Sequence, residues 1–143
     1  MKKFGCKSEH ADERTRDLLR AYFRHIRSCR HIRMPDIFNH IVEMPAARFW
    51  VSSSRAAVVV ARILRGDDLN YMRPSKREMF FEIHRRVVEL QAHNPDLTLH
   101  RLVEMVVSQT APILYLAPAS ARIMILKARK KWFAEKYKNQ QHS

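Results

Sequence analysis

The chain contains two diverged copies of one pattern, and this internal repeat constrains the fold more than any other feature of the sequence. Residues 41–44, Ile-Val-Glu-Met, return as residues 102–105, Leu-Val-Glu-Met. Farther along, residues 49–64 and 115–126 both run from an aromatic residue through an aliphatic and small residues into a stretch of Ala, Arg and aliphatic side chains. The chain is therefore expected to build one structural unit twice.

Upstream of these segments the copies agree in character more than in identity. Residues 16–23 parallel residues 77–84, and this alignment leaves residues 106–109 of the second copy without a counterpart. The alternative is chance similarity between two basic amphipathic stretches. The repeat predicts two units, residues 1–70 and residues 71–143, the second ending in a basic C-terminal helix.

The composition favours helices. The whole chain has only two glycines, whereas tight hairpins draw on glycine for positive φ. Leu, Ala, Arg, Met and Glu are good helix formers, and 46% of the residues are hydrophobic, which is enough for a core. The sequence predicts an all-α fold with two tandem three-helix units, about six helices in all, plus a basic C-terminal extension.

Local signals place the helix ends. The expected helices cover about residues 12–30, 35–43, 75–92 and 98–107, and third helices begin near Ser53 and near Pro118. Ser75 and Glu78 form a capping-box pattern, and the serines at 52–54 can cap the first of the third helices. Gly66 is a helix stop signal.

The chain is strongly basic, with 27 Lys and Arg against 14 Asp and Glu, a net charge of +13. The excess is shared, with 14 basic and 8 acidic residues in 1–70 and 13 and 6 in 71–143. Self-repulsion on this scale is usually retained because a polyanion offsets it. The alternative is a solvated basic face without a partner.

Two cysteines, Cys6 and Cys29, are too few to brace this chain with disulfides, which favours a reducing compartment. The N-terminus begins with lysines but lacks the apolar run of a signal peptide, and the apolar stretch at 56–61 is too short for a membrane span. We expect a cytoplasmic protein with no membrane association.

Each copy resembles a helix-turn-helix DNA-binding unit, with three helices of which the last follows a short connection and is rich in Ala and Arg. Residues 48–52, Arg-Phe-Trp-Val-Ser, and 113–117, Ile-Leu-Tyr-Leu-Ala, are similar to the aromatic-aliphatic step before the recognition helix in Mor-type phage activators. The Gly-rich turn of that family is absent here. The resemblance covers about 25 residues per copy and implies that the third helices contact DNA.

On that layout we predict a nucleic-acid-binding regulator of transcription or an architectural factor, with DNA favoured over RNA. Arg55 and Arg62 lie seven residues apart and so share a helical face. The predicted binding residues are Arg48, Arg55, Arg62, Arg65, Arg122, Lys127, Arg129, Lys130 and Lys131.

Aromatic residues allow two interpretations. Trp50 and Tyr115 could stack on bases, but aromatics at an element boundary more often close a core. The basic stretch 127–138 includes Trp132, Phe133 and Tyr137, which could lie on nucleic acid, an anionic membrane or a partner groove, or could extend the last helix into the core. The aliphatic residues of 58–64 and 123–126 are expected in a core or an interface.

The sequence carries no recognisable catalytic set or phosphate-binding loop, so we predict neither an enzyme nor a cofactor. His25 and Cys29 are four residues apart on a helix, but the other zinc half-site, Cys6 with His10, lies near the terminus, and free cysteines with surface histidines are the default. The alternative function is a helical interaction module that docks an acidic protein partner or RNA, or a homo-oligomer that pairs through residues 58–64.

Overall fold

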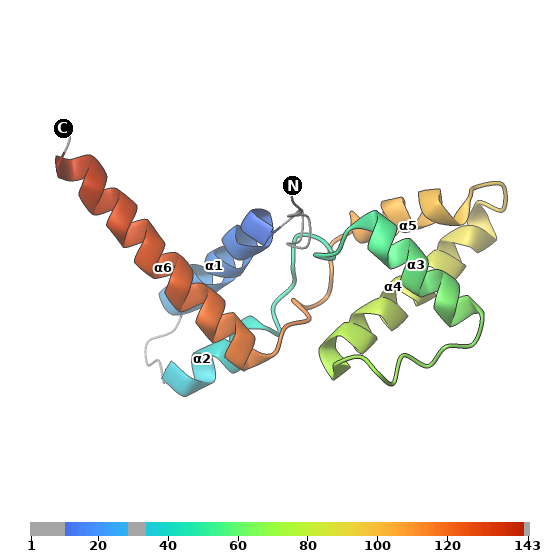
Figure 1. Cartoon of the computed structure of the whole chain (residues 1–143), viewed down its shortest axis with the longest axis horizontal. Helices are drawn as coiled ribbons and strands as arrows, with labels where there is room; N and C mark the ends of the chain where they lie inside the picture. The colour runs from blue at the N-terminus through green and yellow to red at the C-terminus, as the bar shows by residue number, and fades with distance from the viewer. Residues whose placement is uncertain (1–10, 29–33, 142–143) are drawn as a thin grey trace, which may run out of the picture.

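The computed structural model describes residues 11–28 and 34–141, and this part of the chain forms six helices and no strands. The all-α prediction is therefore confirmed (Figure 1). The helices are α1 (Ala11–Ser28), α2 (Met34–Ile41), α3 (Ser53–Leu64), α4 (Pro74–His93), α5 (Leu99–Val107) and α6 (Pro118–Gln141).

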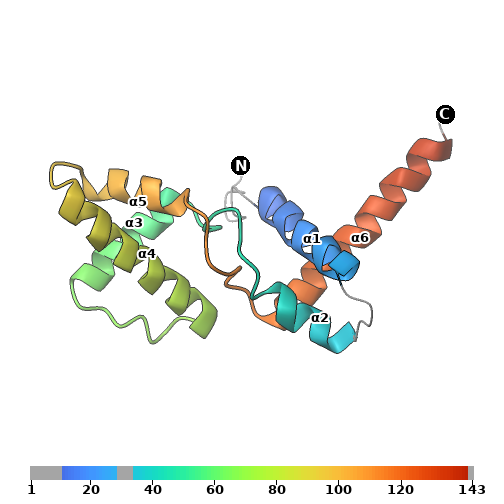
Figure 2. The same ribbon diagram turned by 180° about the vertical axis from the view of Figure 1, so that it is seen from behind.

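The helices pack as two lobes that do not follow the order of the chain. The first lobe contains α1, α2 and α6, and the second lobe contains α3, α4 and α5 (Figures 1 and 2). No helix of one lobe packs against a helix of the other in the described part of the chain. Each third helix therefore completes the lobe that the other repeat begins.

Two crossing segments, residues 42–52 and 108–117, carry the third helices from one lobe to the other. They meet in a reciprocal pair, in which the Ala46 N–H donates to the Ala111 carbonyl at 3.0 Å and the Ala111 N–H donates back at 3.1 Å. Likewise Phe49 N–H donates to Val107 O at 3.1 Å, and Leu114 N–H donates to Val42 O at 3.2 Å. Such reciprocal bonds between antiparallel segments imply a local two-fold axis between Ala46 and Ala111.

The axis relates Ala46 to Ala111, so residue i of the first copy corresponds to residue i + 65 of the second. This offset is the register of the repeat. The sequence alignment of 41–44 with 102–105, and of 16–23 with 77–84, was wrong by four residues. A shift of four is about one helical turn, so it keeps each apolar residue on the same helical face. Residues 106–109 are not an insertion, since α5 continues to Val107.

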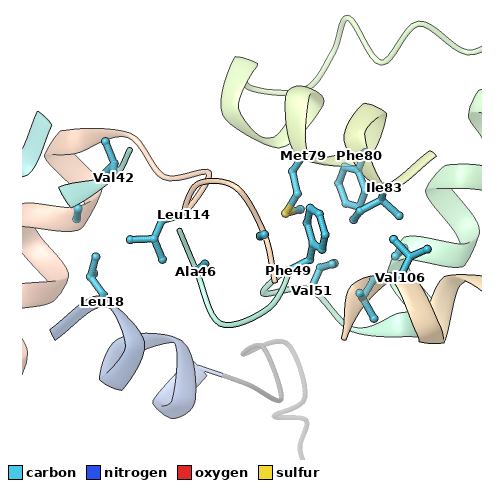
Figure 3. Packing of buried hydrophobic residues seen from close by; sticks show 14 of the residues in the cluster. Leu18, Val42, Ala46, Phe49, Val51, Met79, Phe80, Ile83, Val106 and Leu114 are labelled. Atoms are coloured by element: carbon cyan, nitrogen blue, oxygen red, sulfur yellow. The ribbon is translucent and has the colours of Figure 1, made fainter. Parts of the chain in front are cut away.

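Large apolar side chains from the crossing segments anchor each lobe. Phe49 is fully buried in the second lobe near Met79, Phe80 and Ile83, whereas Leu114 points into the first lobe (Figure 3). The Arg86 guanidinium lies 4.9 Å from the centre of the Phe49 ring. The crossing segments are thus part of the core and not loose linkers.

Two of the predicted helix signals are confirmed and one is wrong. Ser52 caps α3 by accepting the Arg55 N–H at 3.1 Å, and Gly66 follows the end of α3 with φ of +99°. The capping box of Ser75 does not form, because Pro74 is already the first residue of α4 and Arg73 is its N-cap. Proline at the first helical position has a suitable φ and needs no N–H partner.

The residues predicted to lie in a core or an interface fall into two groups. Val59, Val60 and Ile125 are fully buried, as expected for a core, whereas Val58, Leu64, Ile123 and Leu126 are exposed, so that only an interface could cover them. Trp132 and Phe133 are each about half exposed, so the hypothesis that they extend the last helix into the core is wrong.

Candidate nucleic-acid interface

The cations of α3 lie on the face that points away from the core. Ala56, Val59 and Val60 are buried, while Arg55 and Arg62 are exposed, and α3 has no acidic residue. Arg62 donates to the Tyr71 hydroxyl at 3.3 Å. Arg65, the C-cap, is exposed and donates through Nε to the Ala61 carbonyl at 3.2 Å.

The α6 helix carries a denser set of cations. Ala121 and Ile125 are buried in the first lobe, and this fixes the orientation of the helix. Four predicted binding residues are exposed and make no side-chain hydrogen bond or ion pair with the described residues. These are Arg122, Lys127, Lys130 and Lys131.

Two other predicted binding residues are engaged within the protein. Arg129 is half-buried, with its guanidinium 5.8 Å from the ring centres of both Tyr22 and Phe133, and it donates to the Tyr22 hydroxyl at 3.3 Å. Arg48 donates to the carbonyls of Phe49 and Val51 at 3.1 and 3.3 Å. Both side chains therefore have a structural role that the sequence did not indicate.

The two-fold relation pairs some of the predicted binding residues with another cation and pairs others with an uncharged residue. Arg62 corresponds to Lys127, and Arg65 corresponds to Lys130, so two cations recur at equivalent positions after the crossing segments. Arg55 and Arg122 have no cationic counterparts, since Ser120 and Ala57 occupy the equivalent positions. The cations are on separate lobes, and α3 does not pack against α6.

Charge is unevenly distributed between the lobes. The helices of the first lobe contain 12 basic and 5 acidic residues, and those of the second contain 7 and 4. Most of the difference comes from α6, which has 7 basic residues and one acidic residue, Glu135. The positive potential is therefore expected to be strongest along α6.

Sequence reasoning missed the role of Asp17. Asp17 is only 8% exposed, and its Oδ2 accepts from the Ala47 N–H at 2.9 Å and the Trp50 indole N–H at 2.8 Å. Asp17 thereby ties α1 to the first crossing segment and uses the polar group of Trp50. A carboxylate beside the apolar stripe residues Leu18 and Tyr22 was the available signal.

The equivalent carboxylate of the second copy, Glu82, has different partners. It accepts from Arg85 at 2.6 Å and from Arg86 at 2.7 Å. Pro112 occupies the position that corresponds to Ala47. Ala47 donates its N–H to Asp17, whereas proline has no N–H to donate. The hydrogen bond from Arg85 lowers the pKa of Glu82 below its ordinary value, a change further aided by Arg86 and opposed by burial.

An open cleft of about 460 Å³ lies beside Glu82, between α4 and the second crossing segment. Tyr115 lines it with a φ of +53°, a backbone conformation that is rare outside glycine, and its ring stacks on Phe49 at 6.0 Å. Burial raises the pKa of the Tyr115 hydroxyl. Neither Trp50 nor Tyr115 projects as an isolated ring, since both are half-buried against the core.

The remaining motifs give no site within the described residues. No group of three or more potential metal ligands occurs there, and Cys6, His10, Cys29 and His31 lie outside them. The His25 ring stacks on His40 with centroids 5.3 Å apart. None of the described helices has both the length and the apolar character needed to cross a membrane.

No protein-family model, curated protein or solved structure matches the chain.

Proposed function

We propose that this protein binds nucleic acid, as a DNA-binding regulator or architectural factor, and that α6 and α3 supply the contacts. The observation that carries the proposal is the set of exposed α6 cations that make no hydrogen bond or ion pair with the described residues, Arg122, Lys127, Lys130 and Lys131. Lysine and arginine that neutralise phosphates release condensed counterions, and this release drives binding.

The contrast with Arg85 explains why partnering matters. Arg85 is also exposed, but it is held by Glu82 at 2.6 Å and by Glu89 at 2.8 Å. A phosphate would have to compete with two carboxylates for this guanidinium. Lys127 and Lys130 face no such competition within the described chain, so they are better candidates for phosphate contacts.

The local two-fold axis also suits a duplex, whose backbone has its own pseudo-two-fold symmetry. The helix-turn-helix resemblance enters the proposal in a modified form. Within each lobe the second and third helices come from different repeats, so no short turn connects them. The contact helix of a lobe is then the exchanged third helix, α6 or α3.

The test measures binding of the nuclease-treated protein to a random duplex of about 30 base pairs, and to a matched RNA, across a salt series. Joint replacement of Lys127 and Lys130 by Ala should weaken duplex binding and lower the salt slope by about two, one for each lost phosphate contact. Arg85→Ala, the exposed but ion-paired control, should leave the slope unchanged.

No binding to either polymer at low salt would overturn the proposal. Tighter binding to RNA than to the duplex would identify RNA, and not DNA, as the bound nucleic acid. The corresponding α3 pair, Arg62→Ala with Arg65→Ala, tests whether both lobes engage one duplex. An equal fall in slope supports engagement by both lobes, whereas an unchanged slope limits the contact to α6.

A further inference from the structure

The α6 helix has a second apolar stripe, which faces away from its own lobe. Ile123, Leu126, Phe133 and Tyr137 are exposed, at 66%, 39%, 52% and 64%. With Lys130 they follow spacings of three and four residues, the a and d positions of two heptads. We call these five residues the seam.

The seam lies on a different face of α6 from the residues that hold the helix in place. Ala121 and Ile125 are buried in the first lobe, and Ala128 is half-buried. The C-terminal half of α6 extends beyond α1 and α2 (Figures 1 and 2). An exposed run of large apolar residues on a charged helix is a common feature of interaction surfaces.

Most of the residues that flank the seam are basic, and Ala134 is the exception. Lys127 and Arg129 lie between Leu126 and Lys130, at e and g positions, and Lys136 occupies the next g position. The single acidic residue of α6, Glu135, is at the outermost position of the heptad. Charges at e and g positions decide which helices can pair.

We propose that the seam docks an amphipathic helix of another protein, one whose apolar stripe is flanked by Asp and Glu. Such a helix would cover Ile123, Leu126, Phe133 and Tyr137 while its carboxylates face Lys127 and Lys136. An acidic residue opposite Lys130 would pair with the one cation inside the seam. Charge complementarity thus selects both the class of partner and its alignment.

The same charges argue against a second copy of this chain on the seam. Pairing of two α6 helices would bring Lys127, Arg129 and Lys136 of one chain near basic residues of the other. The net charge of +13 adds further repulsion between copies. The proposal does not depend on nucleic-acid binding, because it is carried by apolar residues that a phosphate backbone does not require.

The experiment uses a labelled synthetic peptide of about three heptads, with Ile and Leu at its a and d positions and Glu at e and g. Fluorescence anisotropy with the full chain should give a dissociation constant of about micromolar size. A matched peptide with Lys at e and g should not bind. Joint Ile123→Ser and Phe133→Ser replacement should weaken binding at least about tenfold.

Val58→Ser, which changes an exposed apolar residue on α3, is the matched control and should bind the peptide normally. Because the replaced side chains are exposed, circular dichroism should show all variants folded. Failure of the acidic peptide to bind, or normal binding by the seam double variant, would overturn the proposal. Concentration-dependent mass in light scattering that the double variant abolishes would also overturn it, by assigning the seam to a second copy.

Two other ligands, anionic vesicles and a nucleic-acid duplex, are tested in parallel. Seam-dependent binding to vesicles rich in anionic lipid, without peptide binding, would overturn the proposal in favour of a membrane surface. Duplex binding that the seam double variant reduces as strongly as the lysine double variant, again without peptide binding, would assign the aromatic residues to nucleic acid. A seam variant that binds duplex normally but fails to bind peptide supports an apolar contact that serves the peptide alone, while Lys127 and Lys130 are shared by the two proposed ligands.

Discussion

The two lobes are built on one repeat, yet they differ in how each holds its crossing segment and in where the charge lies. In the first lobe a buried carboxylate, Asp17, binds the segment directly through Ala47 and Trp50. In the second lobe Glu82 pairs instead with Arg85 and Arg86, and an open cleft lies beside it. The third helix of the first lobe has 24 residues, and that of the second has 12.

The two lobes therefore share a framework and diverge in particular features. The shared features, buried Leu18 and Ile83 and the reciprocal backbone bonds at Ala46 and Ala111, preserve the framework. Apart from the buried Asp17, the features that differ are exposed: the cations of α6, its seam and the cleft beside Tyr115. The first lobe is therefore the main candidate for binding, and the second lobe is the more nearly neutral support.

The exchange of third helices predicts the largest effect. Residues 1–70 and residues 71–143, prepared as separate chains, should each lack a cooperative unfolding transition, because each third helix would lose the two helices it packs against. An isolated helix as short as the 12 residues of α3 is marginal in water. Circular dichroism and thermal melts should show the transition restored when the two fragments are mixed. A cooperative transition in either fragment alone would contradict the exchange.

The anchors of the crossing segments should differ in strength. Phe49→Ala should lower the free energy of unfolding by about 4 kcal/mol, and its counterpart Leu114→Ala by about 3 kcal/mol. The ring is larger, is fully buried and also carries the Arg86 guanidinium. Urea denaturation measures both values. A smaller loss of unfolding free energy for Phe49→Ala than for Leu114→Ala would contradict this ranking of the two anchors.

The two equivalent carboxylates should differ in how much each stabilises the protein. Asp17→Ala should cost about 3 kcal/mol, because it leaves the Ala47 N–H and the Trp50 indole N–H without their acceptor. Glu82→Ala should cost about 1 kcal/mol, since its ion pairs are partly solvated. Denaturation gives the energies, and a red shift of tryptophan emission should occur only for Asp17→Ala. Equal costs would mean that burial does not distinguish the two sites.

Arg14 offers a stabilising change, because its repeat counterpart is the buried Met79. The Nε of Arg14 is buried and has no hydrogen-bond partner among the described residues, and burial lowers the pKa of its guanidinium. Arg14→Met should raise the free energy of unfolding by about 1 kcal/mol, since it removes an unsatisfied polar group and keeps the apolar stem. Thermal melts compare it with Arg16→Met on the exposed face, for which no gain is expected.

The smallest effect concerns pH. The pKa of Glu82 is lowered in the folded state, so its contribution is present above the ordinary glutamate value of 4.5 and is lost as pH falls through the folded pKa. Glu82→Gln should therefore be less stable by about 0.5 kcal/mol at neutral pH and should equal the parent in strong acid. Denaturation at a series of pH values measures this difference. A gap that persists in strong acid would assign the effect to packing.

Much of the local structure could be predicted from the sequence. The starts of α3 and α6, the Ser52 cap and the Gly66 stop depend on residues within one or two turns, which the sequence contains in full. The positions of the basic residues on α3 and α6 follow equally from helical spacing. The role of Asp17 could not be predicted, because its partners are about 30 residues away in the chain.

The sequence by itself determined six helical segments, the repeat and the basic charge of the third helices, since these depend on composition and short-range spacing. Only the tertiary structure decided which helices pack together and the four-residue register of the repeat. Helical periodicity is unchanged by a shift of one turn, and an amphipathic helix can bury its stripe in either lobe. The reciprocal bonds of Ala46 and Ala111 and the anchors Phe49 and Leu114 resolve both choices, because they are formed only when the crossing segments meet.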